Sequence, residues 1–259
     1  MSTRTQPVER PRERLRVLEI RHAESEPPGA YGPALHAITE TATLRIWREP
    51  ATVDPADFDA ILVLGGAMGV GDADRIPWIA DEIDLLRRAR ERGVPIWGVC
   101  LGAQMLAAAL GGEVHTSDIP ELGVRRVRLN EAGMADPVWG GAVIAPAPRD
   151  IDTVQWHFDT FTLPPGATLL ASSDACVNQL FRVDNCYGVQ FHLEAGGDLV
   201  RGWLSHQESR SAVAEVLGES ATDRFPIDAA AAEKVTVPTA EAVMRRWLHD
   251  VVGSARPRW

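Results

Sequence analysis

The segment that most constrains the fold is residues 94–112, VPIWGVCLGAQMLAAALGG. It begins with a short apolar run, turns through Gly-Val-Cys-Leu-Gly and continues in small and apolar residues that favour a helix. Gly98 and Gly102 flank Cys100 at two-residue distances. This pattern has the form of a nucleophile elbow with sulfur in place of hydroxyl oxygen. A buried cysteine between two packing glycines would give the same local pattern, so the role of the thiol depends on the rest of the chain.

The N-terminal half of the sequence predicts a parallel sheet with helices on its faces. Residues 58–64, FDAILVL, form a continuous apolar run that ends in two glycines, as expected of a strand buried on both faces. Pro77 suits the first turn of a helix, and Gly93 suits its C-terminal stop. The expected strands are 15–20, 43–47, 58–64 and 94–99, and the expected helices are 34–40, 76–92 and the segment after Cys100. Their order along the chain is that of an α/β fold.

From Gly123 onward the sequence predicts short strands of a mixed sheet. Residues 123–129, GVRRVRL, alternate apolar and charged side chains, which is typical of an antiparallel or edge strand. Asp184 and Asn185 favour a turn between two of the later strands. These later strands are expected at 154–157, 168–172, 179–183 and 187–192. The predicted fold class is therefore α/β, with a mixed, mostly parallel sheet.

The C-terminal part is expected to be helical. A helix is predicted over residues 198–217, followed by a loop that contains Pro226 and then by Ala-rich sequence. The last helix is predicted to start at Thr239, a favourable N-cap, and to stop at Gly253. The expected parts are a disordered tail over residues 1–14, an α/β domain over 15–217 and a helical extension over 218–259 packed on that domain.

Composition limits the partners and the compartment. The chain of 259 residues has a formal net charge of −10, which argues against nucleic acid as the main partner. Its three cysteines do not make a disulfide framework, and no secretory signal or bilayer-spanning run is visible, so a cytoplasmic protein is expected. Cys176 and Cys186 lie ten residues apart, outside zinc-finger spacing, and are interpreted as buried structural thiols. Neither a metal site nor a cofactor is predicted.

Two backbone groups are candidates for stabilising an oxyanion near Cys100. Unpaired N–H groups at a helix N-terminus stabilise a thiolate, and the N–H of Leu101 is placed to donate to an oxyanion. The sequence GGAMGV at 65–70 follows an expected strand, and Gly66 is the expected second oxyanion donor. The alternative for this segment is a flexible loop or a phosphate cradle, although the spacings of a dinucleotide site and of a P-loop are absent.

His192 and Glu194, in the sequence QFHLE at 190–194, are the candidate acid/base pair. In an extended segment, residues i and i+2 project to the same face, so the two side chains can lie side by side. A cysteine nucleophile requires such a pair, because the imidazole must accept a proton and later protonate the leaving amine. Alone, His-x-Glu is more often part of a polar surface strand. Its combination with the elbow and the glycine pair favours catalysis.

Three ordered motifs, GGAM, GVCLGAQ and QFHLE, resemble those of the class I, triad-type glutamine amidotransferases. The resemblance covers roughly residues 15–194 and is greatest to stand-alone proteins similar to the amidotransferase domain of GMP synthase. It implies a flavodoxin-like fold with helices on both faces of the sheet, to which this chain adds C-terminal helices. It also implies hydrolysis of the glutamine side-chain amide to glutamate and ammonia through a γ-glutamyl thioester.

The same resemblance implies roles for individual residues. Cys100 is the implied nucleophile, His192 the acid/base and Glu194 the residue that orients the imidazole. Gly66 and Leu101 remain the oxyanion donors expected from the two loops themselves. The candidate substrate contacts are Gly65, Gln104, His157 and Asp159. For His157, a core or surface role is equally compatible with the sequence.

Two positions depart from the family pattern. Proline is common after the glycine pair and between the histidine and the glutamate, where this chain has Ala67 and Leu193. Neither change removes a catalytic atom, so the expected chemistry is retained. The rigidity of the two loops and the substrate preference stay open.

The destination of the ammonia is open, because nothing after Glu194 resembles an ATP-binding or synthetase module. The first hypothesis is a glutaminase that supplies ammonia to an acceptor or to a separate synthetase. The second is a γ-glutamyl peptidase or hydrolase that uses the same residues on other γ-glutamyl amides. The third is a catalytically silent binding module, which an intact triad disfavours. Neither a nucleic-acid nor a membrane partner is expected, and the sequence does not specify the oligomeric state.

Overall fold

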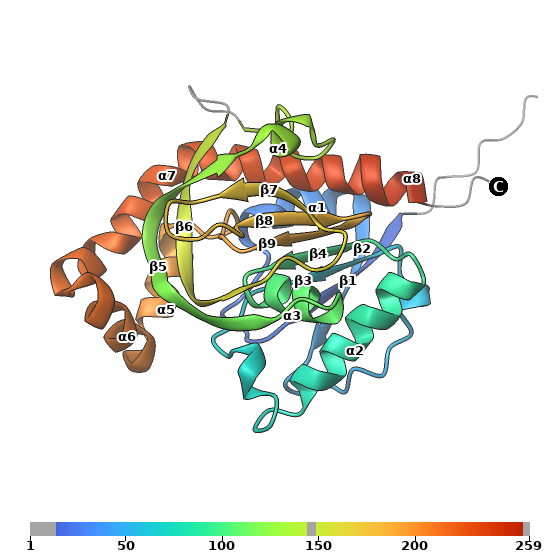
Figure 1. The fold of residues 1–259 in the computed structure, drawn as a ribbon, viewed down its shortest axis with the longest axis horizontal. Helices are drawn as coiled ribbons and strands as arrows, with labels where there is room; N and C mark the ends of the chain where they lie inside the picture. The colour runs from blue at the N-terminus through green and yellow to red at the C-terminus, as the bar shows by residue number, and fades with distance from the viewer. Residues whose placement is uncertain (1–13, 144–148, 256–259) are drawn as a thin grey trace, which may run out of the picture.

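A mixed sheet of nine strands forms the centre of the computed structural model, which describes residues 14–143 and 149–255 (Figure 1). The strands are β1 Leu15–Arg21, β2 Thr39–Arg45, β3 Ala60–Val63, β4 Ile96–Val99, β5 Val114–Leu129, β6 Asp150–Phe161, β7 Thr168–Ser172, β8 Leu180–Val183 and β9 Cys186–Val189. The α-helices are α1 Gly32–Ile38, α2 Trp78–Glu91, α3 Leu101–Ala109, α4 Glu131–Ala135, α5 Gly197–Leu204, α6 Gln207–Leu217, α7 Glu219–Arg246 and α8 Gly253–Ala255. The strand order in the sheet is β2-β1-β3-β4-β9-β8-β7-β5-β6.

The strands from β2 to β9 in this order run parallel, and antiparallel pairing begins at β8. β3 and β4 are buried along their whole length, which explains their continuous apolar sequences. Because β3 and β4 are parallel neighbours, their carboxyl ends bring two loops together, the glycine pair after β3 and the turn at Cys100 after β4. The predicted α/β fold class is confirmed. The candidate site lies at the carboxyl ends of the parallel strands, where such sheets bind ligands.

Helices cover both faces of the sheet. In Figure 1, α2 and α3 lie in front of the sheet, and α7 runs behind it. The front core includes Leu85, Leu106 and Phe181. A smaller core joins α5, α6 and α7 to β5 and β6. On the side of α1 and α7, Trp97 contacts four other buried aromatic rings, those of Tyr31, Trp139, Tyr187 and Trp247.

The C-terminal prediction is wrong at Pro226, at Thr239 and at Gly253, where helical structure continues from a π-helical turn over Trp247–Val252 into α8. α7 is one continuous helix of 28 residues, with Pro226 and Pro238 inside it. Pro226 therefore lies within a helix where a loop was predicted. Thr239 is a buried interior residue of α7 instead of an N-cap. An interior proline costs a helix about 3 kcal/mol. Burial of Phe225, Val243 and other apolar residues of α7 against the sheet and neighbouring helices offsets that cost.

Several boundaries also differ from the predictions. β5 and β6 extend well beyond the predicted 123–129 and 154–157, because they pair through a long antiparallel ladder of backbone contacts. The polar residues at 115–118 and Pro120 hide the first half of β5 in the sequence. β2 starts at Thr39, and β9 ends at Val189. The helical segment predicted over 198–217 is divided into α5 and α6.

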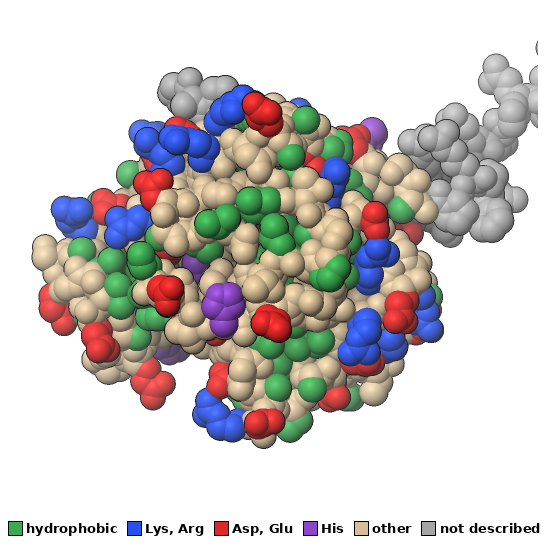
Figure 2. All heavy atoms as spheres, viewed as in Figure 1, with side chains coloured by type: hydrophobic (Ala, Val, Ile, Leu, Met, Phe, Trp, Pro, Cys, Tyr) green, Lys and Arg blue, Asp and Glu red, His purple; other side chains and the backbone are tan. Residues whose placement is uncertain are grey.

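Charged side chains of both signs are interspersed around the rim of the face shown in Figure 2. Among the described residues, we find no helix with the length and apolar character needed to cross a membrane. The tail predicted over residues 1–14 lies outside the described residues, except for Arg14.

Candidate active site

Cys100 lies in a strained turn between β4 and α3. Its φ is +51° and its ψ is −107°, a conformation that residues other than glycine rarely adopt. The Cys100 N–H donates to the Val189 carbonyl at 2.8 Å, and its carbonyl accepts from the Gln104 N–H at 3.0 Å. Strand β9 and the first turn of α3 therefore hold the strained residue in place. The thiol lies at the N-terminus of a helix, as an elbow requires.

Gly98 and Gly102 are required by close backbone contacts around this turn. A Cβ atom at Gly98 would lie 2.5 Å from the Gly102 carbonyl oxygen. A Cβ atom at Gly102 would lie 2.4 Å from the carbonyl oxygen of Val63, on the neighbouring strand. The two glycines therefore let α3 start directly against β3 and β4, which positions Cys100 beside the glycine pair that follows β3.

We predict that Gly102→Ala destabilises the fold by about 1–3 kcal/mol, because the new methyl group meets rigid backbone. The matched control is Gly202→Ala in α5, where an added Cβ atom has no neighbour within 4 Å. Alanine in a helix interior is favoured over glycine by about 0.5–1 kcal/mol, so the control should be neutral or stabilising. Urea denaturation of both variants measures the difference. Equal stability of the two variants would contradict the close contact at Gly102.

His192 and Glu194 form a buried hydrogen-bonded pair. The distance between His192 Nδ1 and Glu194 Oε1 is 2.6 Å. Two hydrogen bonds of 2.9 Å fix the His192 backbone. The His192 N–H donates to the Val154 carbonyl, and the Thr153 hydroxyl donates to the His192 carbonyl. Burial alone lowers the pKa of His192, but the Glu194 carboxylate and the Cys100 thiol outweigh burial and raise this pKa well above its usual value. The imidazole therefore interacts with both side chains.

The loop with the glycine pair packs directly against these groups. A Cβ atom at Gly65 would lie 3.3 Å from His192 Cε1 and 3.7 Å from Cys100 Cβ. A Cβ atom at Gly66 would lie 2.8 Å from Leu101 Cδ2. The absence of side chains at both positions thus lets the backbone approach the cysteine and the start of α3.

A buried pair, His22 and Glu82, supports the glycine loop through the Gly65 carbonyl. The sequence did not indicate this pair. His22 Nδ1–H donates to the Gly65 carbonyl at 2.8 Å, and His22 Nε2 lies 3.0 Å from a carboxylate oxygen of Glu82 on α2. The His22 ring also stacks on Trp78. Burial lowers the pKa of His22, but Glu82 outweighs burial and raises it. This pair fixes the carbonyl of Gly65 and with it the glycine loop.

A cavity of about 370 Å³ collects most of the predicted residues. Of the predicted set, Gly65, Leu101 and Glu194 lie outside its lining. Part of the wall comes from the start of α6 and includes Glu208 together with His206, the residue before this helix. The predicted residues that line the cavity are Gly66, Cys100, Gln104, His157, Asp159 and His192.

Gln104 and Asp159 are joined at one end of the cavity. The Gln104 side-chain amide donates to the Asp159 carbonyl oxygen and to the Gln190 side chain, each at 3.2 Å. The Asp159 carboxylate reaches the glycine loop, because its Oδ2 would lie 2.9 Å from a Cβ atom at Gly69. The structure therefore places the Asp159 carboxylate beside the segment that follows β3.

Trp203 of α5 was missed by the sequence analysis, although it covers His192. The two rings meet edge to face with centroids 5.2 Å apart, and Trp203 Nε1 donates to the Ser25 carbonyl at 3.1 Å. The signal was weak, since a tryptophan in a predicted helix is most often a core residue. α5 and α6 therefore form part of the cavity wall.

Glu26 is a second missed residue, located in the loop between β1 and α1. It lines the cavity together with Cys100 and His192. Burial raises the pKa of Glu26 to about 7, the Glu194 carboxylate adds to this effect, and His192 opposes it. With a pKa of about 7, the Glu26 carboxyl group titrates near neutral pH inside the cavity.

We predict that Glu26 makes the stability of the fold depend on pH between about 4.5 and 7. Because its pKa is raised from 4.5 to about 7 in the folded state, the folded state binds more protons than the unfolded chain in this range. The contribution is fully present below pH 4.5 and is lost as the pH rises through 7, and it amounts to at most about 3 kcal/mol.

Urea denaturation at pH 5 and pH 8 measures this effect. The fall in stability of the wild type between the two pH values should be smaller in Glu26→Gln. The control is Glu24→Gln, a carboxylate of the same loop that is exposed and paired with Arg45; it should keep the wild-type dependence. An unchanged pH dependence in Glu26→Gln would refute the assignment.

Comparison with known proteins identifies the family. Residues 35–199 match the model of the family described as glutamine amidotransferase class-I. The chain belongs to this family. It is 30% identical over 207 residues to a putative glutamine amidotransferase-like protein from Salmonella typhimurium, with 78% of this chain and 84% of that protein covered.

Two further relatives are informative. One subunit of a glutamine-hydrolysing GMP synthase from Halobacterium salinarum is 36% identical over 170 residues, which cover 63% of this chain and 78% of that protein. A crystal structure of a glutamine amidotransferase from Thermotoga maritima superposes with a TM-score of 0.76 at 26% identity, covering 93% of this chain and 99% of that chain. The chain spans 28% of the length of the GMP synthases that it also matches.

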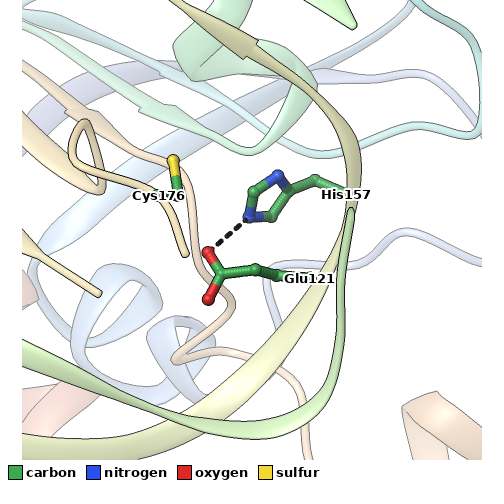
Figure 3. A group of neighbouring side chains, drawn as sticks. All are labelled: Glu121, His157 and Cys176. Atoms are coloured by element: carbon green, nitrogen blue, oxygen red, sulfur yellow. Dashed lines mark ion pairs between the residues drawn. The ribbon is translucent and has the colours of Figure 1, made fainter. Parts of the chain in front are cut away.

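This class-I glutamine amidotransferase contains a second Cys–His–Glu group, formed by Cys176, His157 and Glu121 (Figure 3). Its cysteine lies in the loop between β7 and β8, away from any helix N-terminus. Burial raises the pKa of the Cys176 thiol, which disfavours the nucleophilic thiolate. The His157 and Glu121 side chains are 3.4 Å apart and make no hydrogen bond, unlike the pair at His192. The geometry therefore favours the group around Cys100 as the reactive one.

Proposed function

We propose that the protein hydrolyses the side-chain amide of glutamine through a thioester on Cys100. The observation that carries this proposal is that Cys100, at a strained helix-start turn, shares one cavity with His192, whose Nδ1 is hydrogen-bonded to the buried Glu194 carboxylate. The raised pKa of His192 favours an imidazolium, the form that can protonate the leaving nitrogen. Membership of the glutamine amidotransferase class-I family supports the same chemistry.

In the proposed reaction, the Cys100 thiolate attacks the amide carbon, and the carbonyl oxygen becomes an oxyanion that accepts hydrogen bonds. His192 then protonates the leaving nitrogen, so that ammonia departs and a γ-glutamyl thioester remains. The neutral imidazole next takes a proton from water, and the resulting hydroxide adds to the thioester carbon. Breakage of the C–S bond releases glutamate and regenerates the thiolate. Glu194 orients the imidazole throughout.

The proposed oxyanion donors are the N–H groups of Gly66 and Leu101. Leu101 is the first residue of α3, and the first N–H groups of a helix have no partner within it. The tight packing of Gly66 on Leu101 supports a shared oxyanion site for the two groups. Loss of one such donor costs about 10²–10³-fold in rate.

The proposed substrate contacts are at the end of the cavity formed by Gln104, His157 and Asp159. The Asp159 carboxylate is suited to the ammonium group of an amino acid substrate, because opposite charges attract strongly in a partly dry site. Gly65 contributes by allowing close approach to the triad. Glutamine thus binds with its side-chain amide at Cys100 and its amino acid head toward Asp159.

The acceptor of the ammonia is proposed to be held by a separate synthetase protein. The relative named as one subunit of a glutamine-hydrolysing GMP synthase supports this arrangement. A second candidate function is hydrolysis of larger γ-glutamyl amides. The observation in its favour is that the cavity extends from Cys100 to His206, Glu208 and Ser209 near the start of α6, which gives room for a leaving group larger than ammonia.

The test compares two substrates with one preparation of the full chain. Ammonia release from glutamine and glutamate release from a γ-glutamyl dipeptide are measured, alone and with candidate synthetases. Faster turnover of glutamine supports the glutaminase, and faster turnover of the dipeptide supports the peptidase. Failure of both reactions in folded protein, with and without candidate partners, rejects the enzymatic proposal.

A glutamine analogue with a chloromethyl ketone in place of the amide identifies the nucleophile, because the attacking sulfur forms a stable C–S bond as chloride leaves. Peptide mass mapping should locate the adduct on Cys100. An adduct on Cys176 would transfer the proposal to the second Cys–His–Glu group.

A further inference from the structure

The second Cys–His–Glu group combines three buried side chains from three separate segments. Glu121 of β5 and His157 of β6 are direct partners in the antiparallel ladder, and Cys176 comes from the loop between β7 and β8. One ligand atom from each residue lies within 4.8 Å of the other two. All three residues are at most 5% exposed. Figure 3 shows the Glu121 carboxylate directed at the His157 ring, with Cys176 beside them on a separate segment of the chain.

The hydrogen bonds of His157 determine which ring nitrogen holds a lone pair. His157 Nδ1 lies 3.0 Å from the Asp159 carbonyl oxygen, which can only accept, so Nδ1 carries a proton. In the neutral ring, Nε2 then has a lone pair, and this buried atom has no hydrogen-bond partner among the described residues. A histidine whose other nitrogen donates to a backbone carbonyl is in the usual orientation of a metal ligand.

The atom that faces this lone pair is also an acceptor. Glu121 Oε2 lies 3.4 Å from His157 Nε2 and already accepts hydrogen bonds from the Gln179 amide at 2.5 Å and the Ser173 hydroxyl at 2.8 Å. Two facing acceptors in a buried site repel each other unless a positive charge lies at or between them. The separation of 3.4 Å is close to the distance between two ligands about 2 Å from one tetrahedral ion.

Cys176 adds a third side chain that could ligate a metal ion, and it lies at a cavity through which an ion could enter. Its Sγ lies 3.3 Å from the Thr160 hydroxyl, so a neighbouring donor can orient a thiolate. The same residue lines a second cavity of about 330 Å³, whose lining includes exposed His115 and Asp118. An ion can therefore reach the thiol from the surface through this cavity.

We propose that Glu121, His157 and Cys176 bind a divalent transition-metal ion of the zinc class. A carboxylate, an imidazole and a thiolate are ligands that Zn²⁺ accepts in tetrahedral sites, and water or a substrate fills the fourth position of such three-ligand sites. Binding releases the thiol proton to solvent as the sulfur–metal bond forms. The ion neutralises the repulsion between the two acceptors. Because His157 also lines the Cys100 cavity, the ion holds one wall of that cavity in place.

The alternative occupant is a second proton on His157, which would give an imidazolium–carboxylate pair without metal. The experiment uses the full chain after reduction and chelation, titrated with Zn²⁺ by calorimetry and with Co²⁺ by absorbance. The proposal predicts one equivalent of metal and a thiolate-to-cobalt charge-transfer band. It also predicts that Zn²⁺ raises the melting temperature, since a ligand that binds only the folded state stabilises it.

Single cysteine-to-serine variants test whether Cys176 is a ligand of the bound metal. Cys176→Ser should weaken Zn²⁺ binding by at least about 100-fold and abolish the charge-transfer band. Cys186→Ser is the matched control, because this buried thiol lies outside the group, and it should keep both signals. Cys100→Ser should also keep both, which separates this site from the proposed catalytic thiol. Absence of binding to the wild type, or binding that survives Cys176→Ser, overturns the proposal. Circular dichroism of each variant verifies that it is folded.

Discussion

Cys100→Ala is expected to reduce amide hydrolysis by about 10⁶-fold, to background, while the fold is retained. The expectation follows from the proposed thioester mechanism, in which no other described group can replace the sulfur at the start of α3. Loss of a catalytic nucleophile costs about this factor in other acyl-transfer enzymes. The Cys100 backbone is held by its N–H bond to Val189 and by the bond from Gln104 to its carbonyl, so the smaller side chain leaves the elbow in place.

Steady-state release of ammonia or glutamate measures this loss, and equilibrium binding of glutamine shows that the cavity is retained. Cys186→Ser is the control for removal of a buried thiol, since Cys186 lies in β9 outside the cavity. Activity of Cys100→Ala within about 10-fold of the wild type would exclude the thioester mechanism. Loss of activity in Cys186→Ser would instead indicate that thiol removal damages the core.

Glu194→Gln is expected to lower the rate by about 10⁴-fold with little effect on substrate binding. The Glu194 carboxylate accepts a hydrogen bond from His192 Nδ1–H at 2.6 Å. This bond holds the proton on Nδ1 and leaves Nε2 available to the thiol. A glutamine amide can present its N–H₂ group instead, which favours the opposite tautomer of the imidazole. A carboxylate-to-amide change in Ser–His–Asp enzymes has an effect of this size for the same reason.

The loss should appear in kcat more than in KM, because the tautomer affects proton transfer and leaves the cavity unchanged. The matched control is Glu208→Gln, a carboxylate-to-amide change in the wall that α6 contributes. It should retain most of the rate, since Glu208 is not among the groups that raise the pKa of His192. Equal effects of the two substitutions would show that general electrostatics, and not the orientation of His192, govern the rate.

The local part of the site could be predicted from sequence because its signals lie within short segments. Gly98, Cys100 and Gly102 fall within five residues, and His192 and Glu194 are separated by one. The buried parallel strands before them are equally local, since each is a continuous apolar run. These segments predict the order β3, glycine loop, β4 and elbow, and the structure brings their carboxyl ends together.

The supporting residues could not be predicted, because their roles depend on distant partners. His22 acts on Gly65 through a contact across 43 positions, and Trp203 reaches Ser25 across 178. Glu26 is a loop carboxylate whose raised pKa comes from burial and from charges elsewhere in the fold. The continuous helix α7 was missed for a related reason, since Pro226 and Pro238 signal breaks locally and only tertiary packing offsets them.

The cap that α7 places on α5 has a consequence for biosynthesis. Glu233 of α7 accepts the Gly197 N–H at 2.8 Å, and its side chain fills the space beside Gly196, at the start of the helix that carries Trp203. The catalytic candidates precede residue 195, but the helix that covers His192 is anchored by a residue 36 positions after Gly197. A chain growing on the ribosome from its N-terminus therefore carries Cys100, His192 and Glu194 before α5 can dock over them. The cover over His192 is anchored only when α7 has left the exit tunnel.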